Sequence, residues 1–327
     1  MSKRCLLIAP TTFYSFHEDL TQALERAGYS VDLLNEEYPA NSIGKALGKT
    51  ALGMLRKTTL AELRKRLAAL GHFDLLLIIK GRGLGPEALT LLRQHADRIV
   101  GYNFDSFRFN PSPQDWRHLC DRYCTFDIAD ADKFGLPLVH LFSAVTGRGR
   151  EFPRDTDLSV IMKIHSDRLT YVDRVLQAIP NRKTIVFLFA PNWLEMIKQA
   201  LKAPAAAWRL RRHISFTPLS YDDAMAAISR SRATLDYAHP QQSGITVRCY
   251  EAQSLQVAVI TNNPYVAKAG VFTTGSVATF LLDDDPAKLE TALDRLTEVE
   301  IAPGRRDTDI FVADLLAADP IESEQET

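Results

Sequence analysis

The stretch HFDLLLIIKG, residues 72–81, is a continuous apolar run with turn residues at both ends. Antiparallel strands usually alternate apolar and polar side chains, whereas parallel strands covered by helices on both faces are apolar throughout. The run therefore predicts a buried parallel strand, and parallel strands need crossover connections, most often helices.

The first half of the chain alternates as such crossovers require. Strand patterns occur at residues 3–10, 29–34, 98–106 and 122–127, and helical patterns at 17–28 and 85–97. The second half repeats the alternation, with helices that we expect to start near Ser166, Asn192, Tyr221, Gly244 and Pro286, and strand patterns at residues 157–162, 183–189, 213–218, 233–238, 257–262 and 278–283. The pattern predicts two doubly wound α/β domains.

The domain boundaries follow from composition. SAVTGRGREFPRDT, residues 143–156, is rich in Gly, Pro and Arg and predicts a linker. We expect an N-terminal domain at 1–145, a C-terminal domain at 156–306, and a closing segment at 307–327 whose end, DPIESEQET, is acidic and without aromatic residues. Such a tail is typical of disorder.

Composition excludes some classes of function. The 327 residues carry a net charge of −1, so there is no overall electrostatic attraction to nucleic acid. No apolar run is long enough to span a membrane, and MSKRCLLIAP predicts a first strand rather than a signal peptide. Cys120 and Cys124, with His118, resemble half of a zinc site, but no second pair follows. Reduced, buried cysteines in a cytoplasmic protein are the interpretation we favour, with no metal site.

Polar clusters follow the predicted strands. They are TTFYS, KGRGLG and NFDSFRFN in the first domain, and KIHSDR, YAHPQQSG and TNNPY in the second. In doubly wound sheets, ligands bind outside the carboxyl ends of the strands near the point where strand order reverses. We therefore expect a cleft between the two domains, lined by these loops. KGRGLG matches no phosphate-loop motif and could be only a turn.

HPQQSGITVRCYEA, residues 239–252, predicts a helix that begins at Gly244. A helix start exposes unpaired N–H groups and the positive end of the dipole, so it can hold a phosphate, with hydroxyls from Ser243 or Thr246. Arg248 could face the same anion, and Glu251 could accept from sugar hydroxyls. The alternative is a capped helix in which Arg248 and Glu251 form an ion pair.

Several motifs in chain order resemble one family. They are KGRGLGPEAL, YNFDSF, CDRYCTFDIADADKFGL, DLSVIMKIHSDR and SGITVRCYEA followed by VITNN. The series is similar to bacterial GT-B-fold glycosyltransferases of the capsule, lipopolysaccharide biosynthesis and spore-maturation type, although those proteins usually have a glycine where this chain has IMKIHSDR.

The resemblance implies two Rossmann-like domains facing across a cleft, the C-terminal one binding a nucleotide-sugar donor and the N-terminal one a glycan or lipid-linked acceptor. No cofactor is implied besides the donor substrate. The positions that match the family as donor contacts are His165, Gln242, Gly244, Thr246, Arg248, Glu251 and Asn262. We expect Arg168 of KIHSDR and Ser243 to contact the donor as well.

In the first domain we expect Tyr14, Lys80 and Arg82, from the loops after the strands, to contact the acceptor. An inverting transferase needs a base, for which Asp105 is the first candidate and His17 the second. No Asp-x-Asp motif occupies a strand end, since LDDDP at 282–286 reads as a helix start, so we expect catalysis without a metal.

Other functions stay open at the level of sequence. A nucleotide-sugar epimerase or hydrolase, or a non-catalytic nucleotide-sugar-binding protein, fits the same pattern. Residues 45–66 carry seven basic residues against one acid, Glu62, and WRLRRH at 208–213 is a second basic cluster. Both are either solvated helix faces or contacts to the inner face of the cell membrane.

Overall fold

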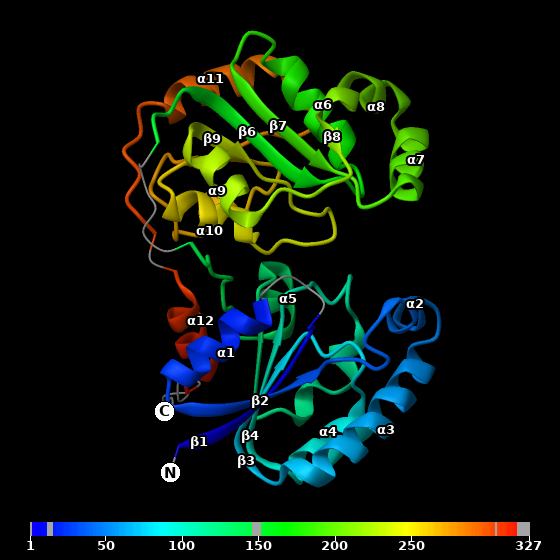
Figure 1. Cartoon of the computed structure of the whole chain (residues 1–327). Coiled ribbons are helices and arrows are strands. Elements are labelled where there is room, and N and C mark those ends of the chain that lie inside the picture. The colour runs from blue at the N-terminus through cyan, green and yellow to red at the C-terminus, as the bar shows by residue number, and fades with distance from the viewer. Residues whose placement is uncertain (1, 12–15, 146–151, 305, 319–327) are drawn as a thin grey trace. The chain divides into compact units, whose positions relative to one another are not determined.

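The structure, a computed structural model, describes residues 2–11, 16–145, 152–304 and 306–318 (Figure 1). Tyr14 and the acidic end of the chain lie outside these residues. The chain divides into two compact units. Unit 1 consists of Met1–Leu141, Gln241–Gly244 and Asp307–Thr327, and unit 2 of Phe142–Pro240 and Ile245–Arg306.

Unit 1 contains a parallel sheet, its helices and two short 3₁₀ turns. Its elements are β1 (Lys3–Ala9), α1 (Phe16–Arg26), β2 (Tyr29–Asn35), α2 (Ser42–Thr50), α3 (Leu52–Leu70), β3 (Phe73–Ile79), α4 (Pro86–Arg93), β4 (Ala96–Asn103), η1 (Ser112–Asp115), η2 (Arg117–Leu119), β5 (Arg122–Thr125), α5 (Ile128–Phe134) and α12 (Thr308–Leu316).

Unit 2 repeats the plan. Its elements are β6 (Thr156–Lys163), α6 (Arg168–Ala178), β7 (Thr184–Phe189), α7 (Trp193–Lys202), α8 (Pro204–Leu210), η3 (Arg211–His213), β8 (Ile214–Ser215), α9 (Tyr221–Ser229), β9 (Ser231–Leu235), α10 (Val247–Ser254), β10 (Ala258–Thr261), η4 (Val266–Lys268), β11 (Val277–Thr279) and α11 (Pro286–Leu296).

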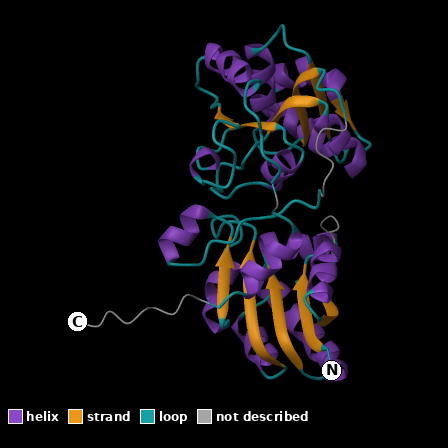
Figure 2. Cartoon of the chain, turned by 90° about the vertical axis from the view of Figure 1, so that its left-hand side faces the viewer, coloured by secondary structure: helices purple, strands orange, loops and turns teal. Residues whose placement is uncertain are grey.

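The sheet of unit 1 has the order β2-β1-β3-β4-β5, and every pairing is parallel (Figure 2). The apolar run at residues 72–81 forms β3, next to β1, with Leu7 opposite Leu77. One face packs on α3 and α4 through residues such as Ile8, Ile78 and Leu63. The next two strands in the sequence, β2 and β3, lie on opposite sides of β1, so strand order reverses between β1 and β3.

α12 covers the other face of this sheet together with α1. The ring of Phe311 on α12 lies edge-on to Tyr102 of β4, with centroids 5.0 Å apart, and also contacts Phe16 of α1. Arg26 binds Asp309 through two guanidinium nitrogens. The sequence predicted only a closing segment here, because nine residues without clear periodicity give a weak helical signal.

The sheet of unit 2 has the order β11-β10-β9-β6-β7-β8 and is also parallel throughout. Strand order reverses between β6 and β9, as in a Rossmann fold. Its core gathers around Val160, Tyr171 and Leu188, with α6, α8 and α11 packed against it. The prediction of two doubly wound domains is confirmed.

One local prediction is wrong. α10 begins at Val247 rather than at Gly244, because Ser243 and Gly244 hydrogen-bond elsewhere. The strand expected at residues 122–127 forms as β5, and burial raises the pKa of Cys120 to about 12 and of Cys124 to about 11. Among the described residues, no helix combines the length and apolarity needed to cross a membrane.

Candidate functional site

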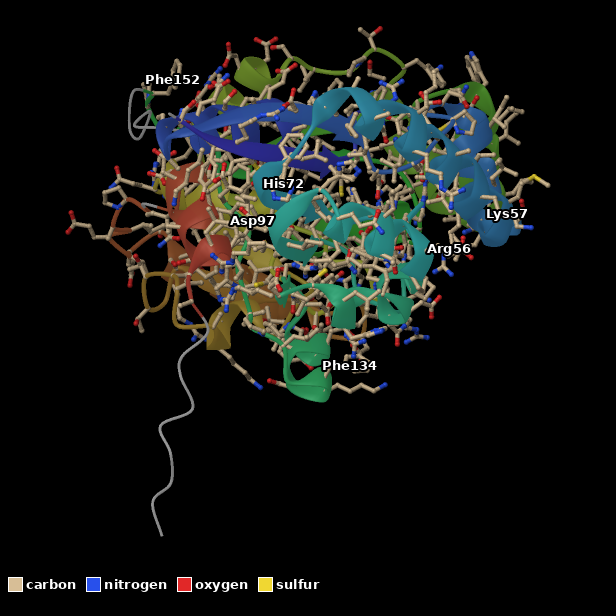
Figure 3. The ribbon with its side chains drawn as sticks, turned by 90° about the horizontal axis from the view of Figure 1, so that it is seen from below. Arg56, Lys57, His72, Asp97, Phe134 and Phe152 are labelled. Carbon is tan, nitrogen blue, oxygen red and sulfur yellow. The ribbon has the colours of Figure 1, made fainter. Side chains whose placement is uncertain are left out.

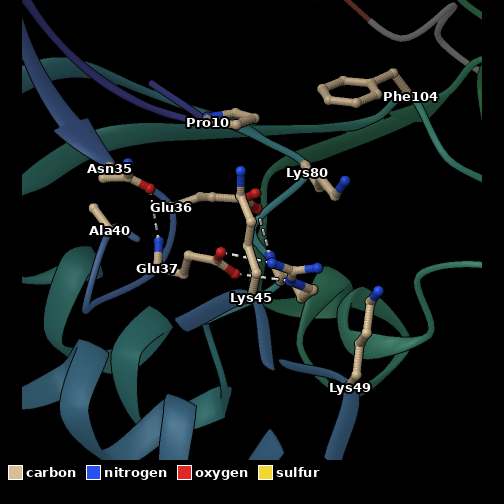
Figure 4. A pocket seen from close by; sticks show the side chains of 10 residues that line it. Pro10, Asn35, Glu36, Glu37, Ala40, Lys45, Lys49, Lys80 and Phe104 are labelled. Carbon is tan, nitrogen blue, oxygen red and sulfur yellow. Dashed lines mark hydrogen bonds and ion pairs between the residues drawn. The ribbon is translucent and has the colours of Figure 1, made fainter. Parts of the chain in front are cut away.

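A cavity of about 170 Å³ opens in unit 1 at the carboxyl ends of the strands (Figure 4). Its walls come from the segments that follow β1, β2, β3 and β4, and from α2. The lining residues are Pro10, Asn35, Glu36, Glu37, Ala40, Lys45, Lys49, Lys80, Arg82 and Phe104. The cavity therefore lies at the switch point between β1 and β3, where doubly wound sheets bind ligands. We call it the switch-point pocket.

A buried ion network forms the floor of this pocket. Arg82 donates from Nε and Nη2 to the two oxygens of Glu37, at 2.7 and 2.6 Å. The backbone N–H of Arg82 donates to Oε2 of Glu36 at 2.8 Å. Glu36 is only 3% exposed, and burial raises its pKa to about 7 although Lys80 and the Arg82 amide act in the opposite direction.

KGRGLG is the turn that builds this network. Gly81 follows Lys80 with a φ of 62°, and a Cβ there would lie 2.6 Å from Trp116. A Cβ on Gly83 would lie 2.7 Å from the carbonyl oxygen of Glu36. Only glycine fits at either position, so the motif brings Arg82 against the loop after β2 rather than cradling a phosphate.

Asp105 lies beside the pocket in an ion pair. Its Oδ2 is 2.7 Å from Nζ of Lys80, and its Oδ1 accepts from Nε2 of Gln242 at 3.1 Å. Both oxygens are engaged, and the structure thus brings three predicted site residues together. His17 lies on the first turn of α1 and does not line the pocket.

Ser243 and Gly244 have a protein carboxylate where we expected a phosphate. Asp127 accepts from Ser243 N at 2.6 Å, from Ser243 Oγ at 2.7 Å and from Gly244 N at 3.3 Å. A Cβ on Gly244 would meet the ring of Phe126 at 2.3 Å. The glycine serves close packing, and its N–H is directed to a carboxylate.

In unit 2, buried polar groups join the carboxyl ends of β9 and β10. Asp236 accepts from Oγ1 of Thr246 at 2.5 Å and from Oγ1 of Thr261 at 2.7 Å. The side-chain amide of Asn262 both accepts from and donates to the backbone of Ala238, at 2.8 and 3.0 Å. Thr246 and Asn262, predicted as donor contacts, thus shape the two loops that follow these strands.

Arg248 and Glu251 form the ion pair that we weighed as the alternative. Nη1 of Arg248 lies 2.8 Å from Oε2 of Glu251, and Nη2 donates to the carbonyl of Ile161 on β6 at 3.4 Å. The pair therefore reaches the central strand of the sheet, next to the switch point between β6 and β9.

His165 and Arg168 lie at that switch point. Arg168 donates to the carbonyls of Lys163, the last residue of β6, and of Tyr237, after β9, at 3.1 and 3.5 Å. Burial lowers the pKa of His165 to about 4, and the positive charges of Arg168 and Lys163 lower it further. His165 is neutral at pH 7, in surroundings whose positive charge favours an anion.

Sequence reasoning missed Glu36 and Glu37, although both follow a predicted strand. The rule that ligands meet the carboxyl ends of strands would have found them in NEE, residues 35–37. Within the described part of the chain, no three His, Cys, Asp or Glu side chains gather in a way that could hold a metal ion. LDDDP behaves as expected: Asp285 caps α11 by accepting from Ala287 N at 2.9 Å.

Solved structures with similar folds include AviGT4, a glycosyltransferase involved in avilamycin A biosynthesis. It is 13% identical, with a TM-score of 0.54, over 96% of this chain and 92% of its own. The UDP-GlcNAc 2-epimerase from Methanocaldococcus jannaschii is 12% identical, with a TM-score of 0.56, over 96% and 99%.

The lipopolysaccharide outer core galactosyltransferase WaaB is 10% identical, with a TM-score of 0.54, over 95% of this chain and 94% of its own. No family model matches the sequence, and no curated protein does. Identities this low establish the fold alone. The chain has the GT-B fold of two Rossmann-like domains.

Proposed function

We propose that the protein is a glycosyltransferase that moves a sugar from a nucleotide-sugar to a glycan or lipid-linked acceptor in the synthesis of a bacterial surface polysaccharide. The observation that carries the proposal is the cluster at the switch point of unit 2. There a neutral His165, Arg168 and the Arg248–Glu251 pair gather beside the central strands of a Rossmann-like sheet. Two proteins with similar folds support it, because AviGT4 is named as a glycosyltransferase and WaaB as a galactosyltransferase.

The predicted donor contacts of unit 2 would bind different parts of the donor. Arg168 and Arg248 would bind the diphosphate of the donor, and Glu251 the hydroxyls of its sugar or ribose. The loops shaped by Thr246 and Asn262 would hold the nucleotide. Gln242, Ser243 and Gly244 belong with unit 1 and stay proposed donor contacts.

The acceptor would bind in unit 1, where Lys80 and Arg82 line the switch-point pocket. Tyr14, which is outside the described residues, stays a proposed acceptor contact. We further propose that transfer needs no divalent metal, since arginines can balance the charge of a leaving diphosphate. The protein would act in the cytoplasm, at the inner face of the cell membrane.

Epimerisation is the second candidate. A specific observation favours it, because UDP-GlcNAc 2-epimerases share the fold over nearly the whole chain. Such an enzyme also binds a nucleotide-sugar, but it needs no acceptor. A non-catalytic nucleotide-sugar-binding protein is the third.

One experiment separates these functions. The purified protein is incubated with a panel of nucleotide-sugars, with and without bacterial glycan or lipid-linked acceptors, and the nucleotide and sugar products are measured. Release of nucleotide that requires the acceptor supports transfer. An isomerised donor in the absence of acceptor supports epimerisation, and binding without turnover supports the third function.

A further inference from the structure

The switch-point pocket has two cations left for a ligand. Lys45 and Lys49 lie one turn apart on α2 and both line the cavity (Figure 4). The other two cations are paired, Lys80 with Asp105 and Arg82 with Glu37. Within the described residues, neither Lys45 nor Lys49 has an ion pair, so their charges are available to an anion.

The pocket also holds a carboxylate with a spare oxygen. Oε2 of Glu36 accepts from the Arg82 amide, whereas Oε1 has no hydrogen-bond partner in the described part of the chain. Both Glu36 and Lys45 line the pocket, and Figure 4 shows their side chains extending into it. A buried carboxylate that faces a cavity and keeps one lone-pair face open is placed to take a proton from a bound hydroxyl.

We propose that the pocket binds an acceptor that carries an anionic group beside its reacting hydroxyl, with Lys45 and Lys49 on the anion and Glu36 on the hydroxyl. This inference rests on the proposed transferase function. In the reaction the acceptor oxygen bonds to the anomeric carbon of the donor, and the bond from that carbon to the diphosphate breaks. The hydroxyl proton passes to Glu36, and the nucleoside diphosphate leaves with the bonding electrons.

The protonation of Glu36 fits this role. Its pKa of about 7 lets it accept a proton near neutral pH and release it afterwards. The charged groups that act on it are Lys80 and Arg82 after β3 and Glu37 on its own loop, and Lys45 and Lys49 on α2 line the same cavity. Its ionisation adds one negative charge to the pocket, so anion binding should weaken as pH rises through about 7.

Glucuronate, whose charge is constant between about pH 6 and pH 8, is the first probe, with glucose as the neutral control. Inorganic diphosphate is the phosphate source, and it is measured in an R168A/R248A background that removes the proposed donor site. Calorimetry should show glucuronate or diphosphate binding that the K45A/K49A variant weakens about tenfold or more, while K57A on the outer side of α3 leaves it unchanged. A response to only one of the two anions tells carboxylated from phosphorylated acceptors. Equal binding of glucose, or binding unaffected in K45A/K49A, overturns the anion site.

The variant E36Q tests the carboxylate, because its amide oxygen can still accept from Arg82. Glucuronate affinity should fall several-fold between about pH 6 and pH 8 in the wild type and stay constant in E36Q. If the same slope persists in E36Q, another group titrates and Glu36 has no such role. Both measurements need no turnover, so a protein that binds the anion as described but transfers no sugar refutes the proposed function and keeps the site.

A second, independent observation concerns the outer face of α7 and α8, at one edge of unit 2 (Figure 1). Leu194, Ile197 and Leu201 recur on one side of α7, and Leu194 and Leu201 are 80% and 79% exposed. Trp193 and Trp208 beside them are 69% and 68% exposed. Exposed apolar side chains at this density mark a binding surface.

Basic residues flank these apolar ones. They are Lys198, Lys202, Arg211 and Arg212, and Arg211 stacks over the ring of Trp208 at 4.1 Å. We infer that this face docks on an anionic lipid bilayer: a helix with an apolar face, interfacial tryptophans and flanking cations lies in the boundary between headgroups and acyl chains.

Flotation with phosphatidylglycerol-containing vesicles tests the docking, with pure phosphatidylcholine vesicles as reference. L194Q/L201Q should lower the bound fraction about fivefold or more, whereas L281Q/L282Q, 37% and 46% exposed between β11 and α11, should leave it unchanged. Trp116 is fully buried, so a blue shift of tryptophan emission on vesicles reports Trp193 and Trp208. If L194Q/L201Q floats as well as the wild type, this face does not contact the membrane. If the protein does not bind vesicles but self-associates, and L194Q/L201Q abolishes the self-association, the face binds a second copy of the chain. Either result overturns the inference.

Discussion

Arg248 and Glu251 pair across one turn of α10, with 2.8 Å between Nη1 and Oε2. The side chain of Glu251 is 8% exposed and that of Arg248 is 21% exposed, so the guanidinium is the partner that a ligand can still reach. An arginine held by a carboxylate keeps one edge preorganised for a diphosphate. The pair is therefore compatible with donor binding and with a purely structural role, and substitution separates the two.

Arg248→Ala and Glu251→Ala should each weaken nucleotide-sugar binding. A charge-assisted hydrogen bond contributes about 1.5–3 kcal/mol, which corresponds to roughly ten- to a hundred-fold in affinity. Calorimetry with the donor found in the panel measures the change, and Arg295→Ala on α11 is the matched control. Unchanged affinity in both variants would leave the pair as a helix brace and place the donor elsewhere.

Much of the fold could be predicted from local pattern. Continuous apolar runs such as residues 72–81 gave the parallel strands, and the alternation of periods gave two doubly wound domains. The start of α10 could not be predicted, because it depends on Asp127, 116 residues before Ser243 in the chain, which takes the N–H groups of Ser243 and Gly244. A contact at that separation leaves no periodic signal.

The candidate site shows the same division. Position after a strand drew attention to Lys80, Arg82 and Asp105, but it did not indicate that their charges are paired within the protein. Pairing depends on which loops meet at the sheet edge, and only the strand order decides that. Glu36 was missed because burial is what raises its pKa, and one polar residue after a strand in the sequence does not show that its side chain is buried.

Gly44→Ala should destabilise the protein, and Gly53→Ala should not. A Cβ on Gly44 would lie 1.9 Å from the carbonyl oxygen of Pro39, whereas a Cβ on Gly53 meets nothing within 4 Å. Overpacking costs about 1–3 kcal/mol, and Ala in an open helical position gains up to about 1 kcal/mol over Gly. Urea unfolding of the two variants measures both. A Gly44→Ala variant as stable as the wild type would mean that α2 can move away from the loop after β2.

Chelation should leave turnover unchanged. Arg168, Arg248 and the neutral His165 offer positive charge and donors for a leaving diphosphate, so the reaction has a route that does not need Mg²⁺. The measurement is the initial rate of nucleotide release with excess EDTA, against the same rate with added Mg²⁺. Full loss of activity that Mg²⁺ restores would contradict this prediction.

The basic segment 45–66 should bind anionic membranes in a salt-sensitive way. Arg56 is held by Asp115, and Arg66 by Glu62, which leaves Lys57, Arg64 and Lys65 exposed on α3; Lys57 projects outward in Figure 3. Each cation near an anionic surface contributes about 1 kcal/mol at moderate salt. Replacing all three by Glu should reduce flotation with phosphatidylglycerol vesicles strongly at low salt and little at high salt. Wild-type flotation of this variant at low salt would make α3 an ordinary solvated face.

Asp105 is either the catalytic base or a carboxylate that only holds Lys80 and Gln242 in place. If it is the base that takes the acceptor proton, Asp105→Asn should lower turnover about 10²–10⁴-fold with donor affinity unchanged. Its carboxylate is bound to Lys80 at 2.7 Å and to Gln242 at 3.1 Å, so a base role requires it to leave one of these partners. Glu36 needs no such step, since one of its oxygens faces the pocket. Steady-state rates of Asp105→Asn, Glu36→Gln and His17→Ala, with the acceptor found in the panel, decide between them. More than about a tenth of wild-type turnover in Asp105→Asn removes Asp105 from the role, and a loss confined to Glu36→Gln assigns the proton to the switch-point pocket.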